Sequence, residues 1–123
     1  MTEYVSTRWY RAPELVLRSR SYSAAIDIFA LGAIMAEMFV GRPIFPGHTE
    51  TDQLMAIVSV LGTPSQAQWP EGYRLSLQSG HKFPQIAQSS LASMLEDKGV
   101  SPDAIDLLQK MLVFDPQKRL TAQ

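Results

Sequence analysis

The pattern of apolar and polar positions along the chain predicts three helices joined by long loops. Residues 24–40 are apolar around the whole circumference of a helix, which is typical of a helix that is buried on every side. Residues 51–61 and 101–114 instead repeat apolar side chains at helical spacing along one face. The two stripes consist of Leu54, Ile57, Val58 and Leu61, and of Ile105, Leu108, Met111 and Leu112. The expected fold is therefore mainly α.

The residues that flank these segments support the same boundaries. Ser23 and Ser101 are good N-caps for the first and third helices, and Pro102 suits a first helical turn. Gly41 and Pro43 follow the central helix and form an ordinary stop signal.

The rest of the chain has weaker signals. Residues 1–12 are expected to be extended or irregular, and Pro13 opens a single helical turn that reaches Leu17. Residues 63–100 combine Trp-Pro-Glu-Gly-Tyr with a stretch rich in Ser and Gln. We expect mostly loop and short helical turns there.

Composition limits the classes of function. The 123 residues are 46% hydrophobic, which suits one packed domain, and the net charge of −1 gives no reason to expect nucleic acid or an anionic membrane as a partner. The absence of cysteine excludes disulfides, thiolate metal sites and thiol nucleophiles, and His48 and His81 have no second ligand at metal spacing. No metal site is predicted. No apolar run is long enough to span a bilayer and no secretory signal is visible, so an intracellular location is expected.

Three charged residues occupy notable positions. Asp27 lies in the most hydrophobic helix, where it either meets the positive end of the helix dipole or accepts hydrogen bonds from a neighbouring loop. Composition alone favours the first reading. Glu14 and Arg119 are candidates for an ion pair that ties one loop to another, but the residues alone do not pair them.

Hydroxyl groups gather near the N-terminal end, beside Arg8 and Arg11. They form either a polar terminus or a phosphorylation switch whose phosphates the arginines would bind. The hydroxyls are those of Thr2, Tyr4, Ser6 and Thr7. Elsewhere the chain has no nucleophile–base pair, glycine-rich phosphate loop or carboxylate–metal cluster, so its own residues do not make an active site.

Residues 2–14, TEYVSTRWYRAPE, resemble the end of the activation segment and the P+1 loop of a protein kinase, closing with Ala-Pro-Glu. Further motifs of that family follow in order, and the ordered set is far more specific than any single piece. They are Asp27-Ile28-Phe29 with Gly32 and Glu37, Arg42 to Gly47 (RPIFPG), Leu61 to Pro64 (LGTP), and Leu112 with Asp115 to Arg119 (DPQKR).

The combination resembles the CMGC group, which contains the cyclin-dependent and mitogen-activated kinases. Within that group it is most similar to the male-germ-cell-associated and intestinal-cell kinases, with the mitogen-activated kinases proper as the near alternative. Phe29 stands where the family usually has Trp, and Ala33 where Cys is common. The motifs G-x-G-x-x-G, V-A-I-K, H-R-D and D-F-G, which bind ATP and Mg²⁺ and supply the catalytic aspartate in the family, are absent from this sequence.

The resemblance implies roles for the activation segment and P+1 loop. Thr2 and Tyr4 match the dual phosphorylation site, and phosphorylated Tyr4 would pair with Arg8 and Arg11. Thr7 matches the threonine that contacts the catalytic aspartate and lysine. The pocket for the residue after the target Ser or Thr, which favours proline in this group, would be formed by Val5, Ser6, Thr7, Trp9 and Arg11.

The resemblance also assigns structural roles. Glu14 and Arg119 match the family's buried ion pair. Asp27 matches the aspartate that hydrogen-bonds the catalytic-loop backbone, which reverses the reading from composition, and Gly32 belongs to the same helix motif. The implied fold is the helical lower lobe of a kinase domain. Its parts would be the activation segment and P+1 loop at 1–17, a central helix at 24–40, a helix at 51–61, a group-specific insert at about 63–100 and a late helix at 101–114.

The implied activity is transfer of the ATP γ-phosphate to Ser or Thr, before proline, with ATP and Mg²⁺ as cofactors of the complete enzyme. This part of it is expected to bind neither and to be inactive alone. Its partners would be protein substrates and an upstream activating kinase, in the cytoplasm or nucleus, with the cilium implied by the subfamily. Two alternatives stay open: a short non-catalytic protein that binds substrates or partners, and a nonfunctional truncated product.

Overall fold

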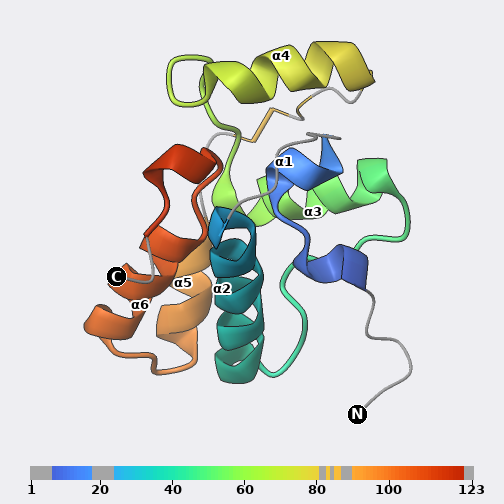
Figure 1. Cartoon of the computed structure of the whole chain (residues 1–123). Coiled ribbons are helices and arrows are strands. Elements are labelled where there is room, and N and C mark those ends of the chain that lie inside the picture. The colour runs from blue at the N-terminus through green and yellow to red at the C-terminus, as the bar shows by residue number, and fades with distance from the viewer. Residues whose placement is uncertain (1–6, 18–23, 81–82, 84, 87–89, 121–123) are drawn as a thin grey trace.

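The computed structural model describes residues 7–17, 24–80, 83, 85–86 and 90–120, and these residues form helices and loops without any strand (Figure 1). The expectation of a mainly α fold is confirmed. The elements in chain order are η1 (Thr7–Tyr10), α1 (Pro13–Val16), α2 (Ala24–Val40), α3 (Glu50–Leu61), α4 (Pro70–Ser79), α5 (Leu91–Asp97), α6 (Pro102–Met111) and η2 (Pro116–Lys118), where η marks a 3-10 helix.

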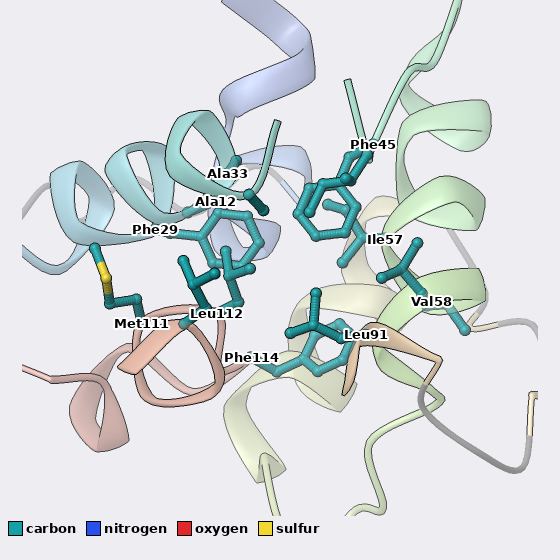
Figure 2. Packing of buried hydrophobic residues seen from close by; sticks show 14 of the residues in the cluster. Ala12, Phe29, Ala33, Phe45, Ile57, Val58, Leu91, Met111, Leu112 and Phe114 are labelled. Carbon is teal, nitrogen blue, oxygen red and sulfur yellow. The ribbon is translucent and has the colours of Figure 1, made fainter. Parts of the chain in front are cut away.

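Helix α2 lies at the centre of the molecule and contacts η1, α5, α6 and η2 (Figure 1). Its helical bounds are those that the apolar run and the stop signal predict. Gly32 allows the close approach of α6, because a Cβ atom there would lie 3.0 Å from the Cβ of Met111 and 3.1 Å from the Cδ2 of Leu112. On the same buried side, the ring of Phe29 stacks on that of Phe45 with the centroids 5.7 Å apart (Figure 2).

The expectation that α2 is buried on every side is wrong for this chain. Leu31, Ile34, Met38 and Phe39 are exposed by 49%, 42%, 79% and 43% of their surface. The elements that pack on α2 cover the side that carries Phe29, and no described element covers the opposite side. We call these four residues the open face of α2.

Helices α3 and α6 follow their apolar stripes. Thr49 caps α3 by accepting a hydrogen bond from the Asp52 amide at 3.1 Å, and Ser101 caps α6 by accepting one from the Ala104 amide at 3.2 Å. The predicted end of the late helix is wrong, since α6 stops at Met111 and not at residue 114. Leu112 leaves the helical conformation, with φ of −99° and ψ of 58°, and the ring of Phe114 beyond it packs on those of Trp69 and Phe83.

Residues 63–100 contain more regular structure than the sequence predicts. Helix α4 has ten residues and packs across one end of the molecule, and α5 has seven (Figure 1). Gly80 ends α4 in the left-handed conformation, with φ of 78°. Trp69 anchors this segment: it is 1% exposed, and its ring lies 5.8 Å from that of Phe114 and 6.1 Å from that of Phe83.

The N-terminal expectation also needs a correction. Residues 7–10 form a 3-10 helix and are not extended, because η1 packs against both α2 and α3. The predicted cap at Ser23 lies outside the described residues. Among the residues that are described, no helix is long and apolar enough to cross a membrane.

Candidate functional site

The site begins at the Ala-Pro-Glu turn that follows η1. Ala12 has the extended conformation, and its carbonyl oxygen accepts hydrogen bonds from the amides of Leu15 at 3.0 Å and Val16 at 3.2 Å. Pro13 opens α1, where the lack of an amide hydrogen costs nothing. Val16 is buried in the main apolar cluster, and α1 packs on α3. The turn therefore fixes the direction in which Glu14 points.

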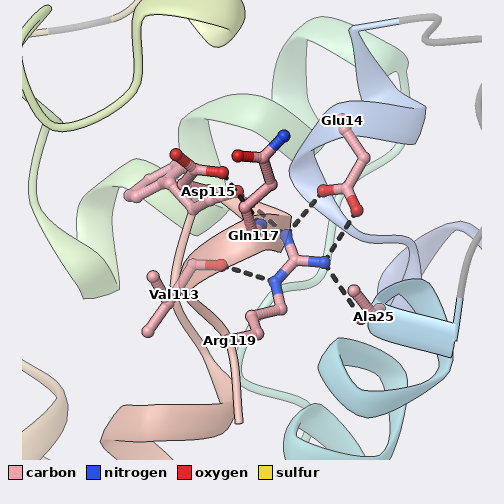
Figure 3. A network of polar contacts seen from close by, with 7 residues as sticks. Glu14, Ala25, Val113, Asp115, Gln117 and Arg119 are labelled. Carbon is pink, nitrogen blue, oxygen red and sulfur yellow. Dashed lines mark hydrogen bonds and ion pairs between the residues drawn. The ribbon is translucent and has the colours of Figure 1, made fainter. Parts of the chain in front are cut away.

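Arg119 meets Glu14 from the far end of the chain (Figure 3). The two guanidinium Nη atoms donate to the two carboxylate oxygens of Glu14, at 2.7 and 2.5 Å. The other donors reach backbone oxygens: Ala25 at 3.0 Å, Val113 at 2.6 Å and Phe114 at 2.9 Å. A guanidinium carries five N–H donors, so all of them are used.

The ion pair is almost completely removed from solvent. The side chains of Arg119 and Glu14 are 0% and 5% exposed, and the guanidinium carbon lies 4.9 Å from the centre of the Phe29 ring. Removing one member of such a pair leaves an uncompensated buried charge, which typically costs about 3–5 kcal/mol. We call this pair the Glu14–Arg119 clamp. It ties the segment after η1 to the loop after α6, as the resemblance implies.

Two aromatic side chains hold η1 to two different elements. The Trp9 indole N–H donates to the carbonyl oxygen of Gly47 at 3.1 Å, and the Tyr10 hydroxyl donates to the carboxylate of Glu37 on α2 at 2.5 Å. Burial and the neighbouring Glu37 carboxylate together raise the pKa of Tyr10 to about 12, so its hydroxyl keeps its proton at neutral pH. The loop is therefore held on two sides.

The loop before α3 supports the Trp9 contact. Gly47 is buried, and a Cβ atom there would lie 2.5 Å from the Cα and 2.6 Å from the amide nitrogen of Gln53. The Gln53 side chain is 0% exposed, and its amide nitrogen donates to the carbonyl oxygen of Phe45 at 2.8 Å.

Other residues implied for the site are placed only in part. Arg11 is exposed. Gly32 is buried against α6, and the side chain of Asp27 is exposed. Thr7 and Arg8 are described only as backbone within η1. Thr2, Tyr4, Val5 and Ser6 lie outside the described residues.

The described residues do not fit ATP or Mg²⁺. No group of three acidic or histidine side chains among them is placed to hold a metal ion. A cleft of about 360 Å³ is lined by residues between Leu61 and Lys118, but its charged groups are already engaged with the backbone. Lys118 donates to the Gln68 carbonyl at 2.8 Å, and Asp115 accepts from the Gln117 amide at 2.9 Å. No reaction step is assigned to these residues.

Local sequence signals do not identify several residues of this site. The sequence motifs include Glu37 and Gly47, but they give no reason to join either residue to the loop at 7–10. No sequence motif assigns a role to Tyr10 or Gln53. Gln53 did carry a usable signal, since it is a polar residue beside Leu54 on the apolar side of a helix. The hydroxyl–carboxylate contact of Tyr10 depends on tertiary packing and has no local signal.

The helical core around α2, the Ala-Pro-Glu turn and its buried arginine define a class of protein. The chain belongs to the protein kinase domain family, whose model matches residues 1–123.

Its curated relatives include the serine/threonine-protein kinase MAK of Rattus norvegicus and the serine/threonine-protein kinase ICK of Mus musculus. Each is 50% identical over 121 residues, which are 98% of this chain and 19% of the relative. The cyclin-dependent kinase F-3 of Oryza sativa subsp. japonica is 49% identical over 122 residues, which are 99% of this chain and 28% of the relative. The chain thus spans about a fifth to a quarter of the relatives that it matches.

Proposed function

We propose that this chain is the substrate-positioning part of a Ser/Thr protein kinase. The kinase would phosphorylate protein substrates at Ser or Thr residues that are followed by proline. Residues 5–11 would form the pocket for the residue that follows the target Ser or Thr. The observation that carries the proposal is how this loop is held in place. The Glu14–Arg119 clamp fixes its end, Trp9 bonds to the loop before α3, and Tyr10 bonds to α2.

A loop held in this way suits selection of a substrate residue by shape. The Trp9 indole N–H is already bonded to Gly47, so the remainder of its partly buried ring offers apolar surface. Proline lacks an amide hydrogen, and an apolar pocket accepts it without leaving a donor unpaired. The similarity to the serine/threonine-protein kinases MAK and ICK and to a cyclin-dependent kinase supports phosphorylation of Ser or Thr.

ATP and Mg²⁺ are the usual cofactors of protein kinases, and they supply the phosphoryl group and neutralise its charge during transfer. Because the described residues do not fit either group, we propose that the chain alone is inactive. Its own contribution would be to bind the substrate peptide and to keep the loop at 7–11 in one conformation.

We also propose that the activation segment is switched by phosphorylation of Thr2 and Tyr4. Arg11 supports this proposal because it is exposed close to Tyr4 in sequence. Each phosphate adds about −1.5 to −2 charges, and an arginine can bind it with two parallel hydrogen bonds. Arg8 would be the second arginine of the pair.

The open face of α2 is a surface against which another part of a larger protein can pack. Four large apolar side chains at one helix face form the kind of surface that marks an interaction site. We propose that the rest of a kinase domain covers this face. The rival proposal, a short non-catalytic lobe that binds partners, would leave it to another protein.

The test uses the full-length kinase that contains this chain, with a pair of peptides that differ only in having Pro or Ala after the target Ser. The proposal predicts ATP-dependent phosphorylation of the Pro peptide with the higher kcat/KM, and none by the 123-residue chain. Equal kcat/KM values for the two peptides would contradict proline selection. Phosphorylation by the 123-residue chain alone would contradict the assignment of the chemistry to other parts of the kinase.

A further inference from the structure

Gln53 occupies a position in α3 where an apolar side chain would be more stable. It is 0% exposed and belongs to the same buried helix face as Leu54 and Ile57. Its Nε2 atom donates to the carbonyl oxygen of Phe45, whereas its Oε1 atom is buried with no hydrogen-bond partner. An unpaired buried carbonyl reduces stability, and such groups in natural proteins call for an explanation. A role in positioning explains it better than a role in stability.

The first link from Gln53 runs to the turn at 45–47. At one end of the turn, the carbonyl oxygen of Phe45 is held by the Gln53 side chain at 2.8 Å. At the other end, the backbone of Gly47 rests directly on the backbone of Gln53, since even a Cβ atom would come within 2.5 Å of the Gln53 Cα. Gln53 therefore contacts both ends of the turn, through its side chain at Phe45 and through its backbone at Gly47.

The second link runs from the turn to the loop at 7–10. The carbonyl oxygen of Gly47 accepts the indole N–H of Trp9 at 3.1 Å. The contact between Tyr10 and Glu37 holds the other side of η1 to α2 and does not involve Gln53. Loss of the Gln53 amide would thus release the Phe45 end of the turn and loosen the Trp9 side of η1, while the Tyr10 side stays attached.

We propose that Gln53 is a positioning residue for the loop at 7–11, which we call the substrate loop. It would act on this loop through the 45–47 turn and Trp9. The inference rests on the proposed function of residues 5–11. Gln53 itself is buried and touches no substrate. Its effect would be on how well the loop is shaped for the residue after the target Ser or Thr, and hence on KM rather than on kcat.

The experiment compares the full-length kinase with its Gln53→Met and Ser59→Ala variants. Methionine keeps the length of the side chain but has no amide, so it removes both the bond to Phe45 and the unpaired oxygen. Ser59 lies on the exposed side of α3, and its hydroxyl donates to the Met55 carbonyl of the same helix, which makes it a matched control. The readouts are hydrogen exchange of residues 7–11, steady-state kinetics on the Ser-Pro and Ser-Ala peptides, and the melting temperature.

We expect Gln53→Met to speed exchange at 7–11 by about two- to tenfold, the effect of one lost hydrogen bond. KM for the Ser-Pro peptide should rise by a similar factor, with kcat within about twofold and with a smaller preference for Ser-Pro over Ser-Ala. Ser59→Ala should change none of these. The melting temperature of Gln53→Met should change little, because the variant loses the unpaired oxygen but also leaves the Phe45 carbonyl without its donor.

The contrary outcomes separate the inference from the proposed function. Unchanged exchange at 7–11 overturns the inference and leaves the proposed function standing. Faster exchange with an unchanged KM contradicts the proposed function of the loop, and the inference fails with it. A lower melting temperature with equal losses of kcat/KM on both peptides would mean a purely structural role, which also overturns the inference.

Discussion

The Glu14–Arg119 clamp and the open face of α2 differ in how completely the described residues provide them with interaction partners. The clamp takes two charges out of water, but all five donors of Arg119 find acceptors within the described residues. The open face is purely apolar, and yet Met38 is 79% exposed. The buried charges are thus fully paired inside the chain, whereas no described element covers the apolar face.

The difference separates what the chain stabilises by itself from what it offers to other parts of a kinase. Both features meet in α2: the Ala25 carbonyl at its beginning binds Arg119, and the open face begins two turns later. Helix α2 therefore contributes both to the clamp and to an apolar surface that no described element covers. Substitutions in the clamp and on the open face test these two roles separately.

The largest effect should come from breaking the clamp. Glu14→Ala and Arg119→Ala in the full-length kinase should each lower the free energy of unfolding by about 3–5 kcal/mol, because either change leaves a buried charge without its partner. The double variant should cost about as much as either single one, measured by chemical denaturation in a double-mutant cycle.

The exposed pair Glu71–Arg74 on α4 provides the control, since surface pairs contribute about 0–1 kcal/mol. Additive losses at Glu14 and Arg119 would break the comparison, because they would mean that the two side chains act independently.

The open face should respond differently in the two forms of the protein. Met38→Ala and Ile34→Ala should change the stability of the 123-residue chain by no more than about 0.5 kcal/mol, the usual range for an exposed position. In the full-length kinase each should cost about 2–5 kcal/mol, because a covered apolar side chain leaves a cavity when it is truncated.

A dye that fluoresces on apolar surface provides the second readout for this face. It should bind the 123-residue chain, and Met38→Ser should weaken that binding. A sharp two-state melt of the isolated chain without dye binding would count against an uncovered interaction surface.

The covered side of α2 gives a smaller and opposite test. Gly32→Ala should destabilise the 123-residue chain and the full-length kinase alike, by about 1–3 kcal/mol, because the new Cβ atom would meet Met111 and Leu112 at 3.0–3.1 Å. The measurement is thermal or chemical unfolding of both forms. A neutral effect would mean that α6 can shift away, and that the packing of this side is less strict than that of the clamp.

The smallest effect belongs to the second attachment of η1. Tyr10→Phe should cost about 0.5–1.5 kcal/mol at neutral pH through loss of the hydrogen bond to Glu37. The fold raises the pKa of Tyr10 from 10.0 to about 12, so the folded state holds this proton more tightly than the unfolded state does. The contribution is complete below pH 10 and is lost as the pH rises towards 12. The stability difference between wild type and Tyr10→Phe should shrink over that interval, and a constant difference would contradict the contact.

Local sequence signals were sufficient for the central elements. The helix bounds of α2 follow from its apolar run and Gly41, and those of α3 from its stripe and Gly62. The signals for α4 were present as well, in Pro70 and Gly80, but its polar composition outweighed them. What holds α4 in place is the burial of Trp69, with Gly72 so close that a Cβ atom would lie 2.1 Å from the indole ring.

The rest depended on contacts between distant residues. The early end of α6 accompanies the packing of Phe114 on Trp69 and Phe83, which are 45 and 31 positions away in the chain. The pairing of Arg119 with Glu14, 105 positions away, was implied by family resemblance and had no local signal. The apolar pattern of α2 does not distinguish an open face from a covered one, because it shows what a helix side prefers and not what covers it. An exposed patch on this helix is expected only from the resemblance, since usual neighbours of the helix in a kinase domain are partly missing from this sequence.

The most direct test of the account is the intact mass of the polypeptide in cells, after capture with an antibody raised against residues 65–100. The account predicts a product much larger than 13.7 kDa, with the clamp, the substrate loop and the covered face of α2 inside one kinase domain. A product close to 13.7 kDa would contradict it. The open face of α2 would then be a surface for a separate partner.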